Sequence, residues 1–183
     1  MKRRVVPRLT LALCLLTLSS ATVLWQAPQT VAEAAGSRGL GKGQQPPAFS
    51  AQDLDGRPHS LEQHAGKIIV LHFWATWCPY CRSEIPKLTR IHRELASKDV
   101  IVLAVSVDED LGQLRSFVAS SQLPYAVIPD AEGNFALTDA YAVSGIPVTY
   151  IIGRDGKMAA RLSGAGDMHA IVQRLAGASS GAS

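Results

Sequence analysis

Cysteine is scarce in this chain, with three in 183 residues. The sequence holds neither a second C-x-x-C pattern nor an H-x-x-x-H pattern. Since a zinc site needs about four ligands, we expect no metal site.

Charge is low as well: 18% of the residues are charged and 47% are apolar, which excludes a disordered chain and indicates a globular core. The length suits one domain with extensions.

A strong charge of one sign is also absent. Of the 18 basic and 15 acidic side chains, four basic and one acidic fall within residues 1–34, which leaves 14 of each in the rest. A nearly neutral domain lacks the basic surface with which proteins bind phosphate backbones. We therefore expect no nucleic-acid partner.

Residues 1–34 have the pattern of an export signal. A basic start is followed by an uncharged stretch from Leu9 to Trp25 and by an A-x-A cleavage pattern at residues 32–34. As a helix, the uncharged stretch would span about 26 Å, slightly less than the roughly 30 Å hydrocarbon core of a membrane. A cleaved signal peptide and a retained N-terminal membrane anchor both remain open. Either way we expect the domain outside the cytoplasm, in a bacterial periplasm or at the outer face of the cytoplasmic membrane.

Composition divides the rest of the chain into three parts. Residues 35–47 are rich in Gly, Gln and Pro, which predicts a flexible linker. The folded domain is expected over residues 48–178. A disordered tail is expected over residues 179–183.

Apolar periodicity predicts an α/β fold. The apolar run at residues 67–73 predicts a strand buried on both faces and central in its sheet, and the pattern around Asp55-Gly56 predicts an N-terminal β-hairpin. Further strands are expected at residues 99–108, 125–130 and, as an antiparallel pair, within 146–162, and helices at 78–97, 110–121, 134–143 and 167–176. This alternation implies a mixed central β-sheet flanked by helices on both faces.

The chemistry centres on Cys78 and Cys81. The third cysteine, Cys14, lies in the uncharged N-terminal stretch, so these two are each other's only partner in the exported domain. Cys78 is expected at a helix start, where backbone N–H groups and the helix dipole lower a thiol pKa from about 8.5 to as little as ~3.5. Cys81 follows one turn later, the spacing of a cysteine that resolves a mixed disulfide formed by Cys78.

Other uses of this cysteine pair fit the sequence less well. A static disulfide would close a loop of only a few residues, where the stabilisation is smallest. Haem attachment needs a histidine after the second cysteine, where this chain has Arg82. The pattern therefore favours redox chemistry, with the Cys78–Cys81 disulfide as the redox centre and no other cofactor.

Three features together resemble a known family. They are WATWCPYC at residues 74–81, Pro86 after it, and Gly-Ile-Pro at residues 145–147. In order and spacing they resemble the thioredoxin superfamily, and more closely its exported TlpA/ResA-like branch of thiol-disulfide oxidoreductases. The resemblance extends from about Pro46 to Leu175 and implies a thioredoxin-like fold.

This resemblance implies roles for particular residues. Cys78 would be the exposed attacking cysteine and Cys81 the resolving one. Pro147 would follow a cis peptide bond that faces the pair, and a cis bond costs only ~0.5–1 kcal/mol before proline. From the residues alone, a trans proline at a strand entry is the other interpretation. A cis bond would expose the backbone of Ile146 to a substrate segment.

The expected substrate surface comprises Trp77, Pro79, Tyr80, Ile146 and Pro147. Trp77 offers flat apolar area that suits unfolded or extended partners. Tyr80, between the two cysteines, is a candidate for tuning the reduction potential.

Glu84 is a candidate for proton transfer, and His72 is a candidate for tuning the thiols. Glu84 falls on the packed face of the helix, where burial would raise its pKa and allow proton exchange with Cys81; exported reductases carry a glutamate at this position. The alternative is a first-turn glutamate favoured by the helix dipole. His72 stands where thioredoxin has a buried acid and the exported branch often has Asn. It is either a satisfied core residue or a group that tunes the thiols or hydrogen-bonds to Glu84.

The predicted function is that of an extracytoplasmic thiol-disulfide oxidoreductase that reduces protein disulfides by dithiol exchange. The resemblance implies disulfide-bearing exported proteins as substrates, with cytochrome c maturation and apocytochrome c as one pathway. It also implies a membrane-embedded thiol reductase as electron donor. A retained N-terminal segment would add a membrane tether.

Rival functions each have a specific difficulty. An oxidase of the same class would be expected to carry the helical insertion of DsbA-like oxidants, which this domain lacks. A copper-binding Sco-like carrier usually spaces its cysteines by three residues and adds a distant histidine. A thiol peroxidase needs threonine three residues before its reactive cysteine, where this chain has Ala75.

Overall fold

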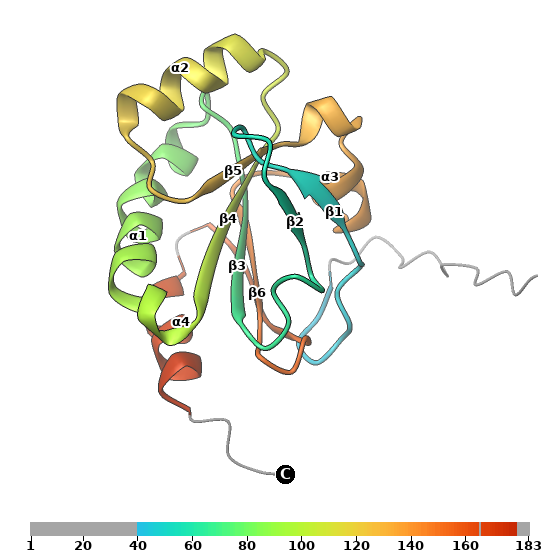
Figure 1. Cartoon of the computed structure of the whole chain (residues 1–183), viewed down its shortest axis with the longest axis vertical. Coiled ribbons are helices and arrows are strands. Elements are labelled where there is room, and N and C mark those ends of the chain that lie inside the picture. The colour runs from blue at the N-terminus through green and yellow to red at the C-terminus, as the bar shows by residue number, and fades with distance from the viewer. Residues whose placement is uncertain (1–39, 165, 179–183) are drawn as a thin grey trace, which may run out of the picture. The chain divides into compact units, whose positions relative to one another are not determined.

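The strand β3 (Ile68–Trp74) is the centre of the sheet, and every one of its residues is buried. In this computed structural model, which describes residues 40–164 and 166–178, the sheet has the strand order β5-β4-β3-β6-β7 (Figure 1). The other bounds are β4 Val100–Ser106, β5 Ala126–Pro129, β6 Val148–Ile152 and β7 Met158–Ser163. β3 is parallel to β4 and antiparallel to β6, and β4 is parallel to β5, so the predicted mixed sheet is confirmed.

The predicted N-terminal hairpin is a separate two-stranded sheet. It consists of β1 (Ser50–Gln52) and β2 (Pro58–Ser60), which pair antiparallel. Gly56 adopts φ = 78° in the turn, a conformation that glycine adopts without steric cost. The carboxylate of Asp53 stabilises the same turn, because it accepts hydrogen bonds from the backbone N–H of Asp55 and of Arg57, each over 2.9 Å.

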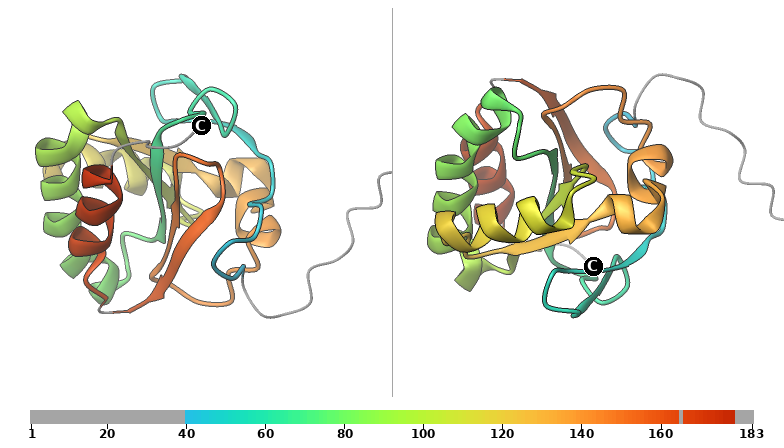
Figure 2. Two further views of the ribbon diagram at one scale, coloured as in Figure 1. Left: turned by 90° about the horizontal axis from the view of Figure 1, so that it is seen from below. Right: turned by 90° about the horizontal axis from the view of Figure 1, so that it is seen from above.

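Helices cover both faces of the five-stranded sheet, as predicted. Their bounds are α1 Pro79–Leu95, α2 Leu111–Ser121, α3 Ala136–Ala140 and α4 Met168–Gly177, with short 3-10 helices η1 Ala96–Lys98 and η2 Asp130–Gly133. α1 and α4 lie side by side on one face, and α3 lies on the other (Figure 2). The core accordingly has two apolar layers: one joins the sheet to α1, α2 and α4, and the other joins it to α3 and the hairpin.

Helix periodicity explains why α1 packs as it does. Leu88, Ile91 and Leu95 recur at helical spacing and are buried against the sheet, on the same side as Cys81 and Glu84. α4 begins at the predicted N-cap, Asp167, whose carboxylate accepts from the backbone N–H of Ala170 over 3.0 Å.

Residues 40–47, the described part of the predicted linker, contact the start of β7. Gly43 N donates to Met158 O over 2.7 Å, and Met158 N donates to Gln44 O over 2.9 Å. The predicted signal or anchor (1–34) and the predicted tail (179–183) lie outside the described residues. Within residues 40–164 and 166–178, no helix has the length and apolar character needed to cross a membrane.

Candidate functional site

Cys78 lies where the loop after the central strand β3 enters α1. It is the N-cap of the helix, and Pro79 occupies the first helical position, where a missing N–H costs nothing. The backbone N–H of Cys81 donates to Cys78 Sγ over 3.2 Å. A sulfur in this position, at the positive end of the helix dipole, is stabilised as the thiolate. The placement of Cys78 is therefore the one that the sequence predicted.

The two cysteines form a disulfide, with their Cα atoms 5.3 Å apart. Cys81 is fully buried, whereas 6% of Cys78 is exposed. Cys78 is thus the more exposed of the two, which agrees with its expected role as the attacking cysteine. It is nevertheless much less exposed than the resemblance implied. The reason is packing: both cysteines belong to the apolar layer between the sheet and α1, and Ile146 packs against that layer.

A buried carboxylate holds the loop that leads to Cys78. Asp108 accepts hydrogen bonds from Thr76 N over 2.9 Å, from Thr76 Oγ1 over 2.6 Å and from Ser106 Oγ over 2.7 Å. Asp108 follows the end of β4, and the parallel strands β3 and β4 bring their carboxyl ends to one edge of the sheet. Sequence reasoning missed this clamp. The available signal was an acidic residue at the end of the strand predicted over residues 99–108.

Glu84 lies on the buried side of α1, three residues after Cys81, and only 4% of it is exposed. Burial raises the pKa of its carboxyl, and the positive charge of Lys87 partly offsets this effect. The predicted burial and the predicted direction of the pKa shift are both confirmed. The catalytic role of Glu84 stays a prediction.

His72 is buried in β3, on the side of the sheet that α1 covers. Burial lowers the pKa of its imidazole to about 4, so the ring is neutral at pH 7. Its Nδ1 lies 2.8 Å from Thr149 Oγ1 but 3.8 Å from Glu84 Oε2, which is too long for a hydrogen bond. The hydrogen bond to Glu84 considered from the sequence is therefore not formed. The β3–β6 register places Thr149 directly opposite His72, and Thr149 takes the bond instead.

The second ring nitrogen of His72, Nε2, is buried and has no hydrogen-bond partner among the described residues. In either neutral tautomer Nε2 is therefore an unsatisfied donor or acceptor, at a cost of about 1–3 kcal/mol. The hydrogen bond to Thr149 Oγ1 forms in both tautomers, with Nδ1 donating in one and accepting in the other.

The peptide bond between Ile146 and Pro147 is cis, as the resemblance implied. Pro147 is buried and precedes β6, and Ile146 is half-buried. Among the described residues, neither the backbone N–H nor the backbone C=O of Ile146 has a hydrogen-bond partner. These two groups are available to a bound segment in extended conformation.

A groove of about 400 Å³ lies between the first turns of α1 and the loop that leads into β6. Four of the predicted site residues line it: Tyr80, Glu84, Ile146 and Pro147. Neither cysteine lines it, and neither do Trp77 and Pro79. The structure thus brings part of the predicted substrate surface together in one groove, beside the helical turn that carries Cys81.

Trp77 and Tyr80 are the exposed large hydrophobic side chains of the described residues, at 62% and 78%. They flank Cys78 in the sequence at the start of α1. Exposed aromatic rings at this place supply rigid apolar contact area for a partner protein. Their predicted role in substrate binding is consistent with this exposure but is not tested by it.

Comparison with known proteins identifies the relationship. Residues 42–161 match the AhpC/TSA family. The chain belongs to this family. Thioredoxin-like protein YneN from Bacillus subtilis (strain 168) is 35% identical over 120 residues, which cover 64% of this chain and 69% of YneN. Thiol-disulfide oxidoreductase ResA from the same organism is 31% identical over 130 residues, or 71% of this chain and 72% of ResA.

A solved structure of a similar protein shows the fold. The crystal structure of a thiol:disulfide interchange protein of the thioredoxin family from Chlorobium tepidum TLS superposes with a TM-score of 0.65. That protein is 28% identical, and the alignment covers 76% of this chain and 97% of that one. The predicted thioredoxin-like fold, the TlpA/ResA-like relationship and the enzyme class of thiol-disulfide oxidoreductase are thereby confirmed.

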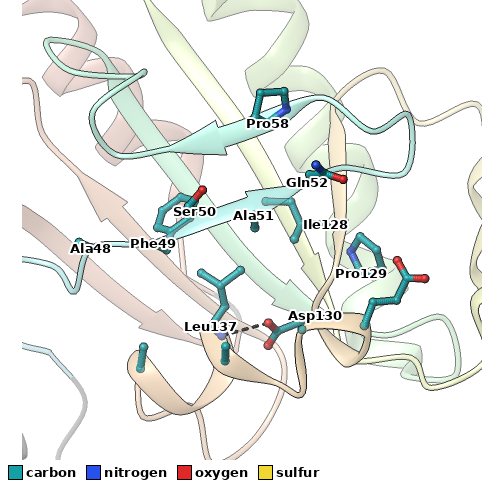
Figure 3. A pocket seen from close by; sticks show the side chains of 14 residues that line it. Ala48, Phe49, Ser50, Ala51, Gln52, Pro58, Ile128, Pro129, Asp130 and Leu137 are labelled. Atoms are coloured by element: carbon teal, nitrogen blue, oxygen red, sulfur yellow. Dashed lines mark hydrogen bonds between the residues drawn. The ribbon is translucent and has the colours of Figure 1, made fainter.

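A second pocket, of about 610 Å³, lies beside the β1–β2 hairpin (Figure 3). Strand β1, the end of β5 and α3 line it, and its buried carboxylate, Asp130, is already bonded to the backbone N–H groups of Leu137 and Thr138. It contains none of the predicted site residues. No group of three or more His, Cys, Asp or Glu side chains suited to a metal ion occurs in the described part of the chain.

Proposed function

We propose that this protein reduces disulfide bonds of exported proteins through the Cys78–Cys81 pair. The observation that carries the proposal is the position of Cys78 as N-cap of α1, with its sulfur accepting the N–H of Cys81 over 3.2 Å. This arrangement stabilises Cys78 as the attacking thiolate in the reduced protein. The couple itself is the redox centre, and no further cofactor is required.

The reaction consists of two thiol–disulfide exchanges. Cys78 thiolate attacks one sulfur of the substrate disulfide, so that the substrate S–S bond breaks and the other substrate sulfur leaves as a thiolate. The Cys81 thiol then gives its proton to the Glu84 carboxylate, and its sulfur attacks Cys78 Sγ. The second substrate sulfur is released as a thiolate and the Cys78–Cys81 disulfide forms. Two electrons have passed to the substrate, and a donor must return two to the protein.

The sequence and the family relationship support a proposal for the compartment and the partners. The export pattern of residues 1–34 supports a site of action in the periplasm or at the outer face of the cytoplasmic membrane. The electron donor is a membrane-embedded thiol reductase, and a retained N-terminal segment would hold the two proteins together. Substrates are disulfide-bearing exported proteins, with apocytochrome c as one candidate in cytochrome c maturation.

The direction of the reaction is tested by the reduction potential of the Cys78–Cys81 couple. Equilibration with glutathione or dithiothreitol buffers, followed by quantification of free thiols, gives this potential. We expect a value near that of thioredoxin, about −270 mV. A value near that of DsbA, about −120 mV, would overturn the proposed direction and favour an oxidase.

The roles of the two cysteines are tested by trapping. A Cys81→Ala variant should stall at the mixed disulfide and accumulate a covalent adduct with an oxidised protein substrate, visible by non-reducing electrophoresis and mass spectrometry. A Cys78→Ala variant is the matched control and should form no adduct. Adducts on Cys78→Ala alone would assign the attack to Cys81 and contradict the mechanism.

A further inference from the structure

Two cationic side chains line the groove beside the cysteine pair. Lys87 comes from the exposed side of α1, and Arg161 comes from β7 on the other side of the groove. Among the described residues, neither forms an ion pair within 4.0 Å of a carboxylate. The groove therefore presents two positive charges that no described carboxylate neutralises directly.

The guanidinium of Arg161 is held in place. Its Nε donates to Tyr150 Oη over 3.2 Å and its Nη1 donates to Ser163 Oγ over 2.8 Å, while its charge lies 5.7 Å from the centre of the Tyr150 ring. Its Nη2 has no hydrogen-bond partner among the described residues. An arginine fixed by two bonds loses little side-chain entropy when a carboxylate binds to its remaining donors.

The rest of the groove does not cancel this charge. Glu84 is its one acidic lining residue, so two cations face one carboxylate even when Glu84 is fully ionised. The other lining residues are uncharged: serine and tyrosine side chains are neutral donors and acceptors, and the rest are glycine or apolar residues. The groove thus keeps a positive charge in either state of Glu84.

An extended segment bound here would carry its side chains at regular intervals. The unpaired N–H and C=O of Ile146 offer the main-chain bonds for strand pairing, and side chains two residues apart then point the same way, about 7 Å apart. A residue two positions from the substrate cysteine would therefore share one face of that segment with the cysteine.

We propose that the groove between Lys87 and Arg161 selects substrate segments that carry a carboxylate side chain close to the reactive cysteine. The inference rests on the proposed reductase function and adds a specificity to it. The carboxylate binds between the Lys87 ammonium and the Arg161 guanidinium, while the substrate backbone pairs with Ile146. Segments with lysine at the same place meet like charges and react more slowly.

The test uses three short peptides with blocked termini. Each has one cysteine linked by a disulfide to 2-thiopyridine, a neutral chromophore, and carries Glu, Gln or Lys two residues before the cysteine. The second-order rate of thiopyridone release by the reduced protein is measured by stopped flow. We expect the Glu peptide to react about 3- to 10-fold faster than the Lys peptide at low salt, with the Gln peptide between them. The difference should shrink at about 1 M salt, where the Debye length falls to roughly 3 Å.

Charge variants of the protein locate the effect. Lys87→Gln and Arg161→Gln should each lower the Glu-to-Lys rate ratio, and the double variant should bring it close to one. Arg93→Gln is the matched control, because Arg93 is an exposed cation of α1 that does not line the groove. That variant removes the same net charge and should keep the ratio.

The outcomes separate this inference from the function on which it rests. Equal rates for the three peptides, or a ratio that the double variant leaves unchanged, would overturn the inference while reductase activity stands. A ratio lowered as much by Arg93→Gln would assign the effect to net charge and equally overturn it. Failure of every peptide to release thiopyridone would contradict the reductase function itself, and the specificity with it.

Discussion

Glu84 and Cys81 are one helical turn apart on α1, and both are buried against the sheet. Burial raises the pKa of Glu84, which makes it a better proton acceptor for the Cys81 thiol. Replacing the carboxyl by an amide removes that acceptor and keeps the shape. In Glu84→Gln we expect the release of the mixed disulfide to slow by about 10²-fold, the lower end of the usual contribution of general base catalysis.

This prediction has a control on the same helix. Glu94 is exposed and pairs with Arg90 and His169, outside the groove, so Glu94→Gln should leave both steps of the reaction unchanged. Stopped-flow measurement resolves the two steps as separate phases. A loss in Glu84→Gln confined to the first phase, mixed-disulfide formation, would show that Glu84 does not act on Cys81.

Some properties of single residues were predictable and others were not. The helix N-cap position of Cys78 and the burial of Glu84 follow from local spacing, because a C-x-x-C after a strand and an i, i+4, i+7 pattern fix a place on a helix. The low exposure of Cys78 does not follow, since it comes from packing in an apolar layer whose members lie far apart in the sequence, from Ile68 to Val172. The bond from His72 to Thr149 likewise spans 77 residues.

At the scale of elements, Asp108 connects the end of β4 to the loop between β3 and α1. Its carboxylate accepts hydrogen bonds from three donor groups, two of which belong to Thr76, two residues before Cys78. In Asp108→Asn the new amide nitrogen cannot accept from these donors, which leaves at least one of them buried without a partner. We expect a loss of about 1–3 kcal/mol in the free energy of unfolding, measured with urea. We also expect slower alkylation of Cys78 at pH 6–7, because the loop no longer fixes the sulfur at the helix start.

Asp130 supplies a matched control for this second effect. It is also a buried carboxylate and accepts from Leu137 N, Thr138 N and Thr138 Oγ1, but it caps α3 on the opposite face of the sheet. Asp130→Asn should lose similar stability and leave the alkylation rate of Cys78 unchanged. If the two variants changed that rate equally, Asp108 would have only a structural role.

The elements themselves were the most predictable level of the structure. All strands and α-helices expected from periodicity are present, because burial on one helical face or on both strand faces leaves a local pattern in the sequence. The cis bond before Pro147 was not decidable from the residues, which favoured a trans proline, and only the resemblance pointed to it. The groove was not predictable either, since Lys87 and Arg161 come from elements 74 residues apart that no local pattern connects.

At the scale of the whole molecule, His72 makes stability depend on pH. Its pKa is about 4 in the folded protein, because burial disfavours the charged ring, against about 6.5 in an unfolded chain. Between these values the unfolded state binds more protons than the folded state. Stability is therefore fully present above about pH 6.5 and is lost as the pH falls toward 4. For this single group the free energy of unfolding at pH 5 is lower by about 2 kcal/mol than above pH 6.5.

Other ionisable groups also make the stability depend on pH, so the test compares the protein with a His72 variant. Burial lowers the pKa of His64 and of His92 as well, which acts in the same direction, while the raised pKa of Glu84 acts in the opposite direction. Urea unfolding of the oxidised protein at pH 7.5 and at pH 5 gives the total change. In His72→Asn, which has no ionisable group in β3, the change between the two pH values should be smaller by about 2 kcal/mol. This difference is independent of any stability that the variant loses at pH 7.5 through the missing bond to Thr149. Equal changes in the two proteins would mean that His72 accepts its proton without unfolding, through an opening of the layer between β3 and α1 that the folded structure does not show.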